Sequence, residues 1–207
     1  MNLLRTASTV SLLTLASRVT GLVRETLVAA AFGATAWADA YQVAFRIPNL
    51  LRRLFAEGAF SQAFVPILAD TQVREGEAQT RRLVDAVATV LFWVLVATCA
   101  VGIVGAPVVV WLMASGLKEF DGAVVMTRIM FPYIGFMSMV ALSAGILNTR
   151  RRFAVPAATP VLLNVAVILA AWLLVPRFPG WGIEPAYALA VGVMAGGVLQ
   201  LAVQVPA

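Results

Sequence analysis

The sequence predicts an all-α membrane protein, a bundle of six transmembrane helices, from its composition and from the length of its apolar runs. The chain has 207 residues, of which 61% are hydrophobic and 12% charged, whereas soluble domains are typically about 45–50% apolar and about 25% charged. The apolar residues gather in runs of the roughly 20 residues that a helix needs to cross a bilayer. These runs lack the alternation of β-strands, so they are predicted as helices.

Six apolar runs follow one another along the chain. Glycines punctuate the connections: Gly33 follows the first run, Gly76 lies in a polar loop predicted over 70–82, and Gly180 follows the fifth run. The prediction is one domain over residues 1–207. The predicted spans are roughly 9–31, 41–68, 84–113, 124–147, 157–175 and 185–205.

Basic residues in the connections predict the orientation of the helices. The side of the membrane that is richer in Lys and Arg is expected in the cytoplasm. It holds Arg5, Arg74, Arg81, Arg82 and Arg150 to Arg152, against Lys118 and Arg177 on the other side. Six spans then place both the N-terminus and the C-terminus in the cytoplasm. The triple arginine at 150–152 fits either topology anchoring or binding of anionic lipid head groups.

Several kinds of chemistry are excluded by the residue types. The chain has no histidine and one cysteine, Cys99, within an apolar run. Zinc sites, histidine bases and Ser-His-Asp triads are therefore not expected. The isoelectric point near 10.3 would suggest nucleic acid in a soluble protein, but topology accounts for the basic surplus here. We expect that the chain is not an enzyme and that it binds no metal, no cofactor and no nucleic acid.

The first predicted span carries charges that a lipid-facing helix does not tolerate. Ser17, Arg18, Arg24 and Glu25 all lie within it. A charge near the centre of a span costs about 2.5–3.5 kcal/mol on the insertion scale, whereas each Leu or Val returns about 0.3–0.6 kcal/mol. Ser17 and Arg24 are seven residues apart, as are Arg18 and Glu25, so they form one polar stripe. This stripe is expected to face protein or water.

The second predicted span repeats this pattern. Polar residues share one face if the helix is continuous: Asp39, Arg46, Asn49, Arg53 and Glu57. Arg52 points about 100° away from that face. Pro48 lacks a backbone donor and is expected to interrupt the segment, which predicts a bent or broken helix lining a cavity. Arg53 and Glu57, four residues apart, fit either a structural ion pair or a role in ligand binding.

The cationic surplus of these two spans favours an anionic ligand. Arg18 and Arg52 fall near mid-depth, and Arg24 lies about 9 Å further outward at 1.5 Å per residue. Charges at such depth are costly and are usually kept for function. Arginine suits phosphate because its fork forms paired hydrogen bonds and stays charged at any working pH.

The remaining spans are expected to serve structure. Asn148 and Asn164 are predicted to make capping or interhelical contacts. Glycines of the last span predict close helix packing: Gly192, Gly196 and Gly197. Tryptophans near span ends are predicted interface anchors: Trp37, Trp111, Trp172 and Trp181.

Several motifs of the chain resemble one known family. The longest is the run NLLRRLFAEGAFSQAFVP over 49–66. Shorter ones lie at 17–21 with Arg24, 38–40, 131–133, 145–149 and 197–201. Over its whole length and in the same order, the chain resembles the MurJ (MviN) lipid II flippases.

This resemblance implies a transporter of the bacterial inner (cytoplasmic) membrane with two facing six-helix lobes and two further helices. Family members move lipid II, an undecaprenyl-pyrophosphate-linked peptidoglycan precursor, between leaflets by alternating access. The implied partners are lipid II, membrane lipids and the cell-wall synthesis machinery. The chain matches the first lobe, so the C-terminal lobe is expected to be absent from it. The implied substrate-binding residues are Arg18, Arg24, Arg52, Ser17 and Asn49, and the implied cavity charge partners are Glu25, Asp39, Arg53 and Glu57.

Three alternatives remain open at the level of the sequence. A related exporter of other lipid-linked glycans or of drugs would share the fold, although an arginine-rich cavity favours an anionic cargo. A non-transporting scaffold of cell-wall synthesis would not need arginines at mid-depth. An enzyme acting on the lipid would need a base or metal site, and the sequence offers no such cluster.

Overall fold

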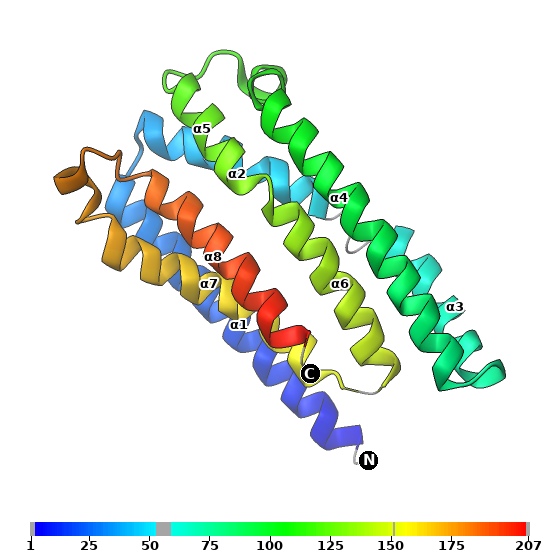
Figure 1. Cartoon of the computed structure of the whole chain (residues 1–207). Coiled ribbons are helices and arrows are strands. Elements are labelled where there is room, and N and C mark those ends of the chain that lie inside the picture. The colour runs from blue at the N-terminus through cyan, green and yellow to red at the C-terminus, as the bar shows by residue number, and fades with distance from the viewer. Residues whose placement is uncertain (1–2, 53–58, 151, 206–207) are drawn as a thin grey trace.

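The computed structural model describes residues 3–52, 59–150 and 152–205, and within these it describes only the backbone of 3–7, 51–52 and 59–62. The described chain is helical throughout, which confirms the all-α class (Figure 1). Its helices are α1 (Leu3–Phe32), α2 (Ala36–Arg52), α3 (Ala59–Arg74), α4 (Glu77–Ala114), α5 (Phe120–Met130), α6 (Tyr133–Thr149), α7 (Ala154–Leu174), the 3₁₀ helix η2 (Phe178–Trp181) and α8 (Tyr187–Gln204).

Two of the six predicted spans each contain two helices. The span predicted over 124–147 is divided at Pro132 into α5 and α6, because proline lacks the N–H that would continue the helical ladder. The span predicted over 41–68 contains most of α2 and the first part of α3, and residues 53–58 between them lie outside the described chain.

The interruption predicted at Pro48 is wrong. Pro48 lies inside α2, which continues to Arg52. A proline removes one backbone hydrogen bond, yet α2 continues for four residues past Pro48, whose side chain is fully buried.

The polar loop predicted over 70–82 is also largely helical. Helix α3 runs to Arg74 and α4 begins at Glu77, so the chain reverses within a short turn where Gly76 takes a left-handed φ of 81°. The charged residues that suggested a loop pair along the helices instead, Arg74 with Asp70 at 2.7 Å and Arg81 with Glu77 at 3.1 Å. Such pairs four residues apart stabilise helix ends that extend into water.

The connections sort to two ends of the bundle. Both described termini, the α3–α4 turn and the α6–α7 connection lie at one end in Figure 1, and the α1–α2, α4–α5 and α7–α8 connections lie at the other. Arg150 reaches Glu77 at 3.7 Å, which joins the α6–α7 connection to the start of α4. Both termini lie at the same end of a bundle when the chain runs along it an even number of times.

Four helical segments of the described chain are long and apolar enough to cross a membrane: Glu77–Ala114, Phe120–Thr149, Ala154–Leu174 and Tyr187–Gln204. Helix α1 has 30 residues, or about 45 Å at 1.5 Å per residue, but it carries Arg18, Arg24 and Glu25 along its length. These charges distinguish the composition of α1 from that of the four apolar segments. Helix α1 packs chiefly against α7.

Glycines on α8 let it approach its neighbours closely, as the sequence predicted. A Cβ on Gly192 would lie 2.7 Å from the Cβ of Ala170, and one on Gly196 would lie 2.7 Å from Cδ1 of Leu163, both on α7. A Cβ on Gly197 would lie 2.8 Å from the ring of Tyr133 on α6. Small residues at such crossings are the main device for helix packing in membranes.

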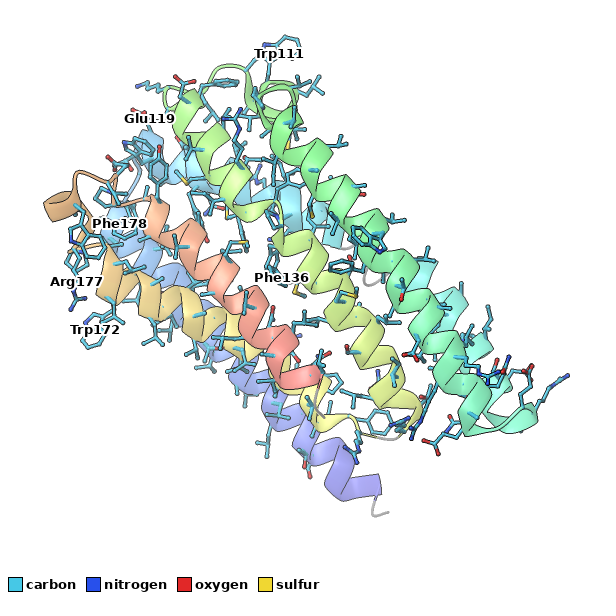
Figure 2. The ribbon with its side chains drawn as sticks, viewed as in Figure 1. Trp111, Glu119, Phe136, Trp172, Arg177 and Phe178 are labelled. Atoms are coloured by element: carbon cyan, nitrogen blue, oxygen red, sulfur yellow. The ribbon has the colours of Figure 1, made fainter. Side chains whose placement is uncertain are left out.

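The tryptophans divide into two groups. Trp111, Trp172 and Trp181 are 59%, 72% and 62% exposed, and Trp111 and Trp172 project outward near helix ends (Figure 2). Trp37 instead packs within the bundle, where its ring meets that of Tyr187 edge to face at 5.7 Å and fills the space over Gly122. Trp37 therefore differs from the other three tryptophans in that its ring packs against α5 and α8, and its role as an interface anchor stays a prediction.

Candidate anion-binding cavity

The polar residues of α1 and α2 face two adjoining hollows, which we call the polar cavity. The larger hollow, about 720 Å³, is bounded by α1, α2, α4, α6, α7 and α8. The smaller, about 530 Å³, lies between α1 and α2. The two hollows share four of their lining residues: Arg24, Phe45, Arg46 and Asn49.

Asn164 of α7 fixes the polar stripe of α1. Its side chain is 6% exposed, and its Oδ1 accepts a hydrogen bond from Nη1 of Arg24 at 3.1 Å. Its Nδ2 donates to the backbone oxygen of Ser17 at 3.0 Å and to Oγ1 of Thr20 at 3.1 Å. The amide lies close to the backbone of α1 at Gly21, where a Cβ would lie 3.5 Å from Nδ2, an ordinary contact. The interhelical contact predicted for Asn164 is therefore confirmed.

Arg24 is the most enclosed cation of the cavity. Its side chain is 16% exposed and its guanidinium lies 5.7 Å from the ring centroid of Phe45, within range of a cation–π attraction. Nη2 meets Oε1 of Glu25 at 3.3 Å, but that carboxylate is 72% exposed. Arg24 is thus held by a neutral amide and a ring on its buried side and by a solvated carboxylate on its open side.

The structure brings together most of the predicted site residues that it describes. Ser17, Arg18, Arg24 and Asn49 line the larger hollow, and Glu25 lines the smaller. Asp39 lines neither hollow; it is exposed in the first turn of α2, a position where a carboxylate favours the helix dipole.

Three predicted residues cannot be placed in the cavity. Arg52 ends α2, and its side chain is not among those described. Arg53 and Glu57 lie outside the described residues. Their predicted roles, and the choice between a structural pair and a role in ligand binding for Arg53, stay predictions.

Two cavity residues were not singled out as site residues from the sequence. Arg46 lines both hollows, and its place on the polar face of the second span was the available signal. Gln200 of α8 is 2% exposed, donates to the backbone oxygen of Thr159 at 2.9 Å and lines the larger hollow. Gln200 belongs to the 197–201 motif of the family resemblance, but its role in the cavity follows from the packing of α8 against α7.

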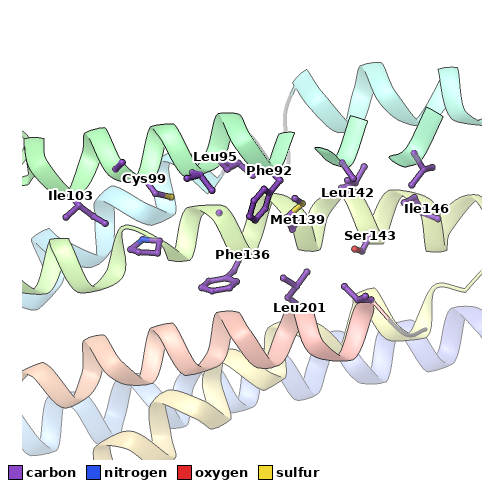
Figure 3. A pocket seen from close by; sticks show the side chains of 17 residues that line it. Phe92, Leu95, Cys99, Ile103, Phe136, Met139, Leu142, Ser143, Ile146 and Leu201 are labelled. Carbon is purple, nitrogen blue, oxygen red and sulfur yellow. The ribbon is translucent and has the colours of Figure 1, made fainter. Parts of the chain in front are cut away.

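A second, apolar groove lies on the other side of α6. It has a volume of about 620 Å³ and is lined by α4, α6 and the end of α8 (Figure 3). Phe92, Leu95, Met139 and Leu142 project into it, and Ser143 and Cys99 are its polar members. No charged residue of the described chain lines this groove.

The polar cavity is suited to an anion. Arg18, Arg24 and Arg46 line it, and Glu25 is the one acidic side chain among its described lining residues, which leaves a net charge of +2. Neither Arg18 nor Arg46 has an ion-pair partner among the described residues. Guanidinium groups without a carboxylate partner bind phosphate oxygens through charge-assisted, paired hydrogen bonds.

Known proteins match nearly the whole chain. A protein of Burkholderia cenocepacia named "Lipid II flippase MurJ" is 58% identical over 210 residues, a match that covers 100% of this chain and 40% of that protein. A "Probable lipid II flippase MurJ" of Vibrio cholerae is 42% identical over 215 residues, which cover 99% of this chain and 40% of that protein. The chain thus spans about 40% of the length of these relatives.

The fold is shared with a solved structure. The structure described as "Lipid II flippase MurJ, inward closed conformation" superposes with a TM-score of 0.75 at 26% identity, over 95% of this chain and 42% of that one. The family model described as "Lipid II flippase MurJ" matches residues 28–207. The chain therefore belongs to the MurJ family of lipid II flippases.

Proposed function

We propose that the chain is the N-terminal lobe of a flippase that moves lipid II, an undecaprenyl-pyrophosphate-linked peptidoglycan precursor, from the inner to the outer leaflet. The observation that carries this proposal is the convergence of Arg18, Arg24 and Arg46 on one cavity with a net positive charge. A pyrophosphate head group supplies the charge that such a cavity lacks. The names of the relatives describe a transporter rather than an enzyme.

The proposed roles follow from position and chemistry. Arg18, Arg24 and Arg52 hold the diphosphate, and Ser17 and Asn49 offer hydrogen bonds to the head group. A larger set of charged residues keeps these arginines in place or pairs with them in one state of the cycle: Glu25, Asp39, Arg53 and Glu57. The described geometry that supports these roles is the shared lining of one hollow by Ser17, Arg18, Arg24 and Asn49.

The proposed mechanism is alternating access. The polar head group enters the hydrated cavity while the polyprenyl chain stays in lipid, and the lobes then rock to expose the cavity to the other side. A C-terminal lobe supplies the opposite wall of the cavity, since the chain spans about 40% of the length of its relatives. No covalent step is required.

The proposed setting is the bacterial inner membrane, crossed several times, with both ends of the chain in the cytoplasm. This orientation is supported by the basic residues at the end of the bundle that holds Arg81, Arg150 and both termini. Membrane lipids and the cell-wall synthesis machinery are the further partners proposed.

The test is translocation by the full-length protein reconstituted in vesicles. Arg18→Ala, Arg24→Ala and Arg52→Ala are each expected to lower the rate of lipid II translocation by about tenfold or more, because a hydrogen bond to a charged group contributes about 1.5–3 kcal/mol. Arg74→Ala is the matched control, since it removes an arginine that is 75% exposed and pairs with Asp70 on α3. Unchanged translocation in all three cavity variants would refute the proposal.

A further inference from the structure

Arg24 is held in the cavity by a neutral side chain. Asn164 is buried, and its Oδ1 is the acceptor that meets Nη1 of Arg24 on the inner side. Buried guanidinium groups in proteins are more commonly matched by a carboxylate. Here the nearest carboxylate, Glu25, belongs to the adjacent residue of the same helix and is 72% exposed.

The choice of an amide has an electrostatic consequence. A carboxylate in the position of Asn164 would orient Arg24 equally well but would cancel its charge at a distance of about 3 Å, where Coulomb interactions in a protein are strong. An amide oxygen orients the same guanidinium through its dipole and leaves the charge in place. The charge then remains available to whatever anion enters the cavity.

The amide is itself locked in one orientation. Its Nδ2 donates to the backbone oxygen of Ser17 and to Oγ1 of Thr20, and both are acceptors, since the Thr20 hydroxyl donates to the backbone oxygens of Ala16 and Ser17. Because Nδ2 must face these acceptors, Oδ1 must face Arg24. The contacts on α1 thereby decide which end of the amide meets the arginine.

We propose that Asn164 is a positioning residue that aims Arg24 into the polar cavity without neutralising it, and so sets the affinity of the cavity for an anionic head group. This proposal rests on the proposed function, because it takes Arg24 as a contact of the anionic cargo. It assigns a positioning role to a residue of α7 that lines the same hollow as Arg24.

The test measures binding of undecaprenyl diphosphate to the full-length protein in nanodiscs. Asn164→Asp keeps the size and the acceptor oxygen toward Arg24 and adds a negative charge beside it. It also replaces Nδ2 by an oxygen that cannot donate to Ser17 and Thr20. The expected result is an affinity lowered by about tenfold or more, which corresponds to about 1.4 kcal/mol, with the protein still folded by thermal melting. Asn148→Asp, on an exposed position of α6, is the matched control that adds the same charge elsewhere and is expected to bind as the wild type.

The outcomes separate the two proposals. Loss of affinity in Arg24→Ala and Asn164→Asp, with binding kept in Asn148→Asp, supports both. If Arg24→Ala loses affinity and folded Asn164→Asp does not, the positioning role is overturned and the proposed function stands. If Arg24→Ala binds as the wild type, the contact between Arg24 and the cargo is refuted, and the positioning role falls with it.

A second variant keeps the test decisive if Asn164→Asp does not fold. Asn164→Ala removes the amide that holds Nη1 of Arg24 without adding charge, and it leaves Glu25, which already meets Nη2 at 3.3 Å, as the carboxylate that can draw the guanidinium out of the cavity. Lowered affinity is expected, with recovery in the double variant Asn164→Ala/Glu25→Gln, in which the competing carboxylate is gone. A structural role alone predicts no such recovery, so its absence would overturn the proposal.

Discussion

The larger part of the polar cavity and the apolar groove are similar in size and opposite in lining. The larger part of the polar cavity measures about 720 Å³ and the apolar groove about 620 Å³. They share α6 as a wall: Tyr133 and Met137 line the cavity, whereas Phe136 and Met139 line the groove. On α8 the same division falls between the adjacent residues Gln200 and Leu201.

The difference shows that neighbouring residues of one membrane helix can face a polar and an apolar hollow. Adjacent residues point about 100° apart, so a step of one residue moves a side chain from a region that holds guanidinium groups to one that holds hydrocarbon. Lipid offers helices no hydrophobic gain from associating. The lining of each hollow, and not the packing around it, therefore decides which one can receive a charged head group.

The largest effect on the protein is expected when a charged side chain is introduced into the apolar groove. Met139→Arg places a guanidinium in the groove near the middle of the Phe120–Thr149 segment, where the insertion scale gives a cost of about 2.5–3.5 kcal/mol. We expect the amount of protein in the membrane fraction to fall sharply on immunoblots. Arg18→Leu in the polar cavity is the matched control, which removes a charge; it is expected to accumulate normally in the membrane but to lose translocation. Normal accumulation of Met139→Arg would show that water reaches the groove.

Thiol labelling should distinguish the hollows without disturbing either. Cys99 is the one cysteine of the chain and lines the groove (Figure 3), and Ser17→Cys would place a thiol in the cavity. Because the thiolate is the reactive form and needs water to ionise, a charged maleimide is expected to label the second thiol and spare Cys99. The experiment uses full-length variants in which the tested thiol is the sole cysteine. Equal labelling of the two thiols would contradict a difference in water access between the cavity and the groove.

The smallest effect is expected from a conservative change in the groove. Met139→Leu nearly conserves volume and adds no polar group, so the free energy of unfolding should change by less than about 1.5 kcal/mol. Translocation should stay near the wild-type rate in the vesicle assay. A large loss would mean that the groove takes part in handling the cargo.

Much of the fold and part of the site could be predicted from the sequence. The apolar runs placed the helices, and the charges of the first span identified the cavity-facing side of α1. The family resemblance is confirmed by a relative that matches the whole chain and by the family model over residues 28–207. The extents of α3 and α4 around Gly76 could not be predicted, because pairs such as Arg81 with Glu77 stabilise helix in a stretch whose composition is typical of a loop.

By itself, the sequence determined that the chain is a membrane-embedded helical bundle and that Ser17, Arg18 and Arg24 share a polar stripe, since apolar length and helical spacing are local properties. Only the tertiary structure decided what holds that stripe. Asn164 lies 140 residues from Arg24 along the chain, and it meets Arg24 because α7 packs along α1. Whether an arginine keeps its charge free depends on the nearest partner in space, and residue spacing within one helix does not contain that information.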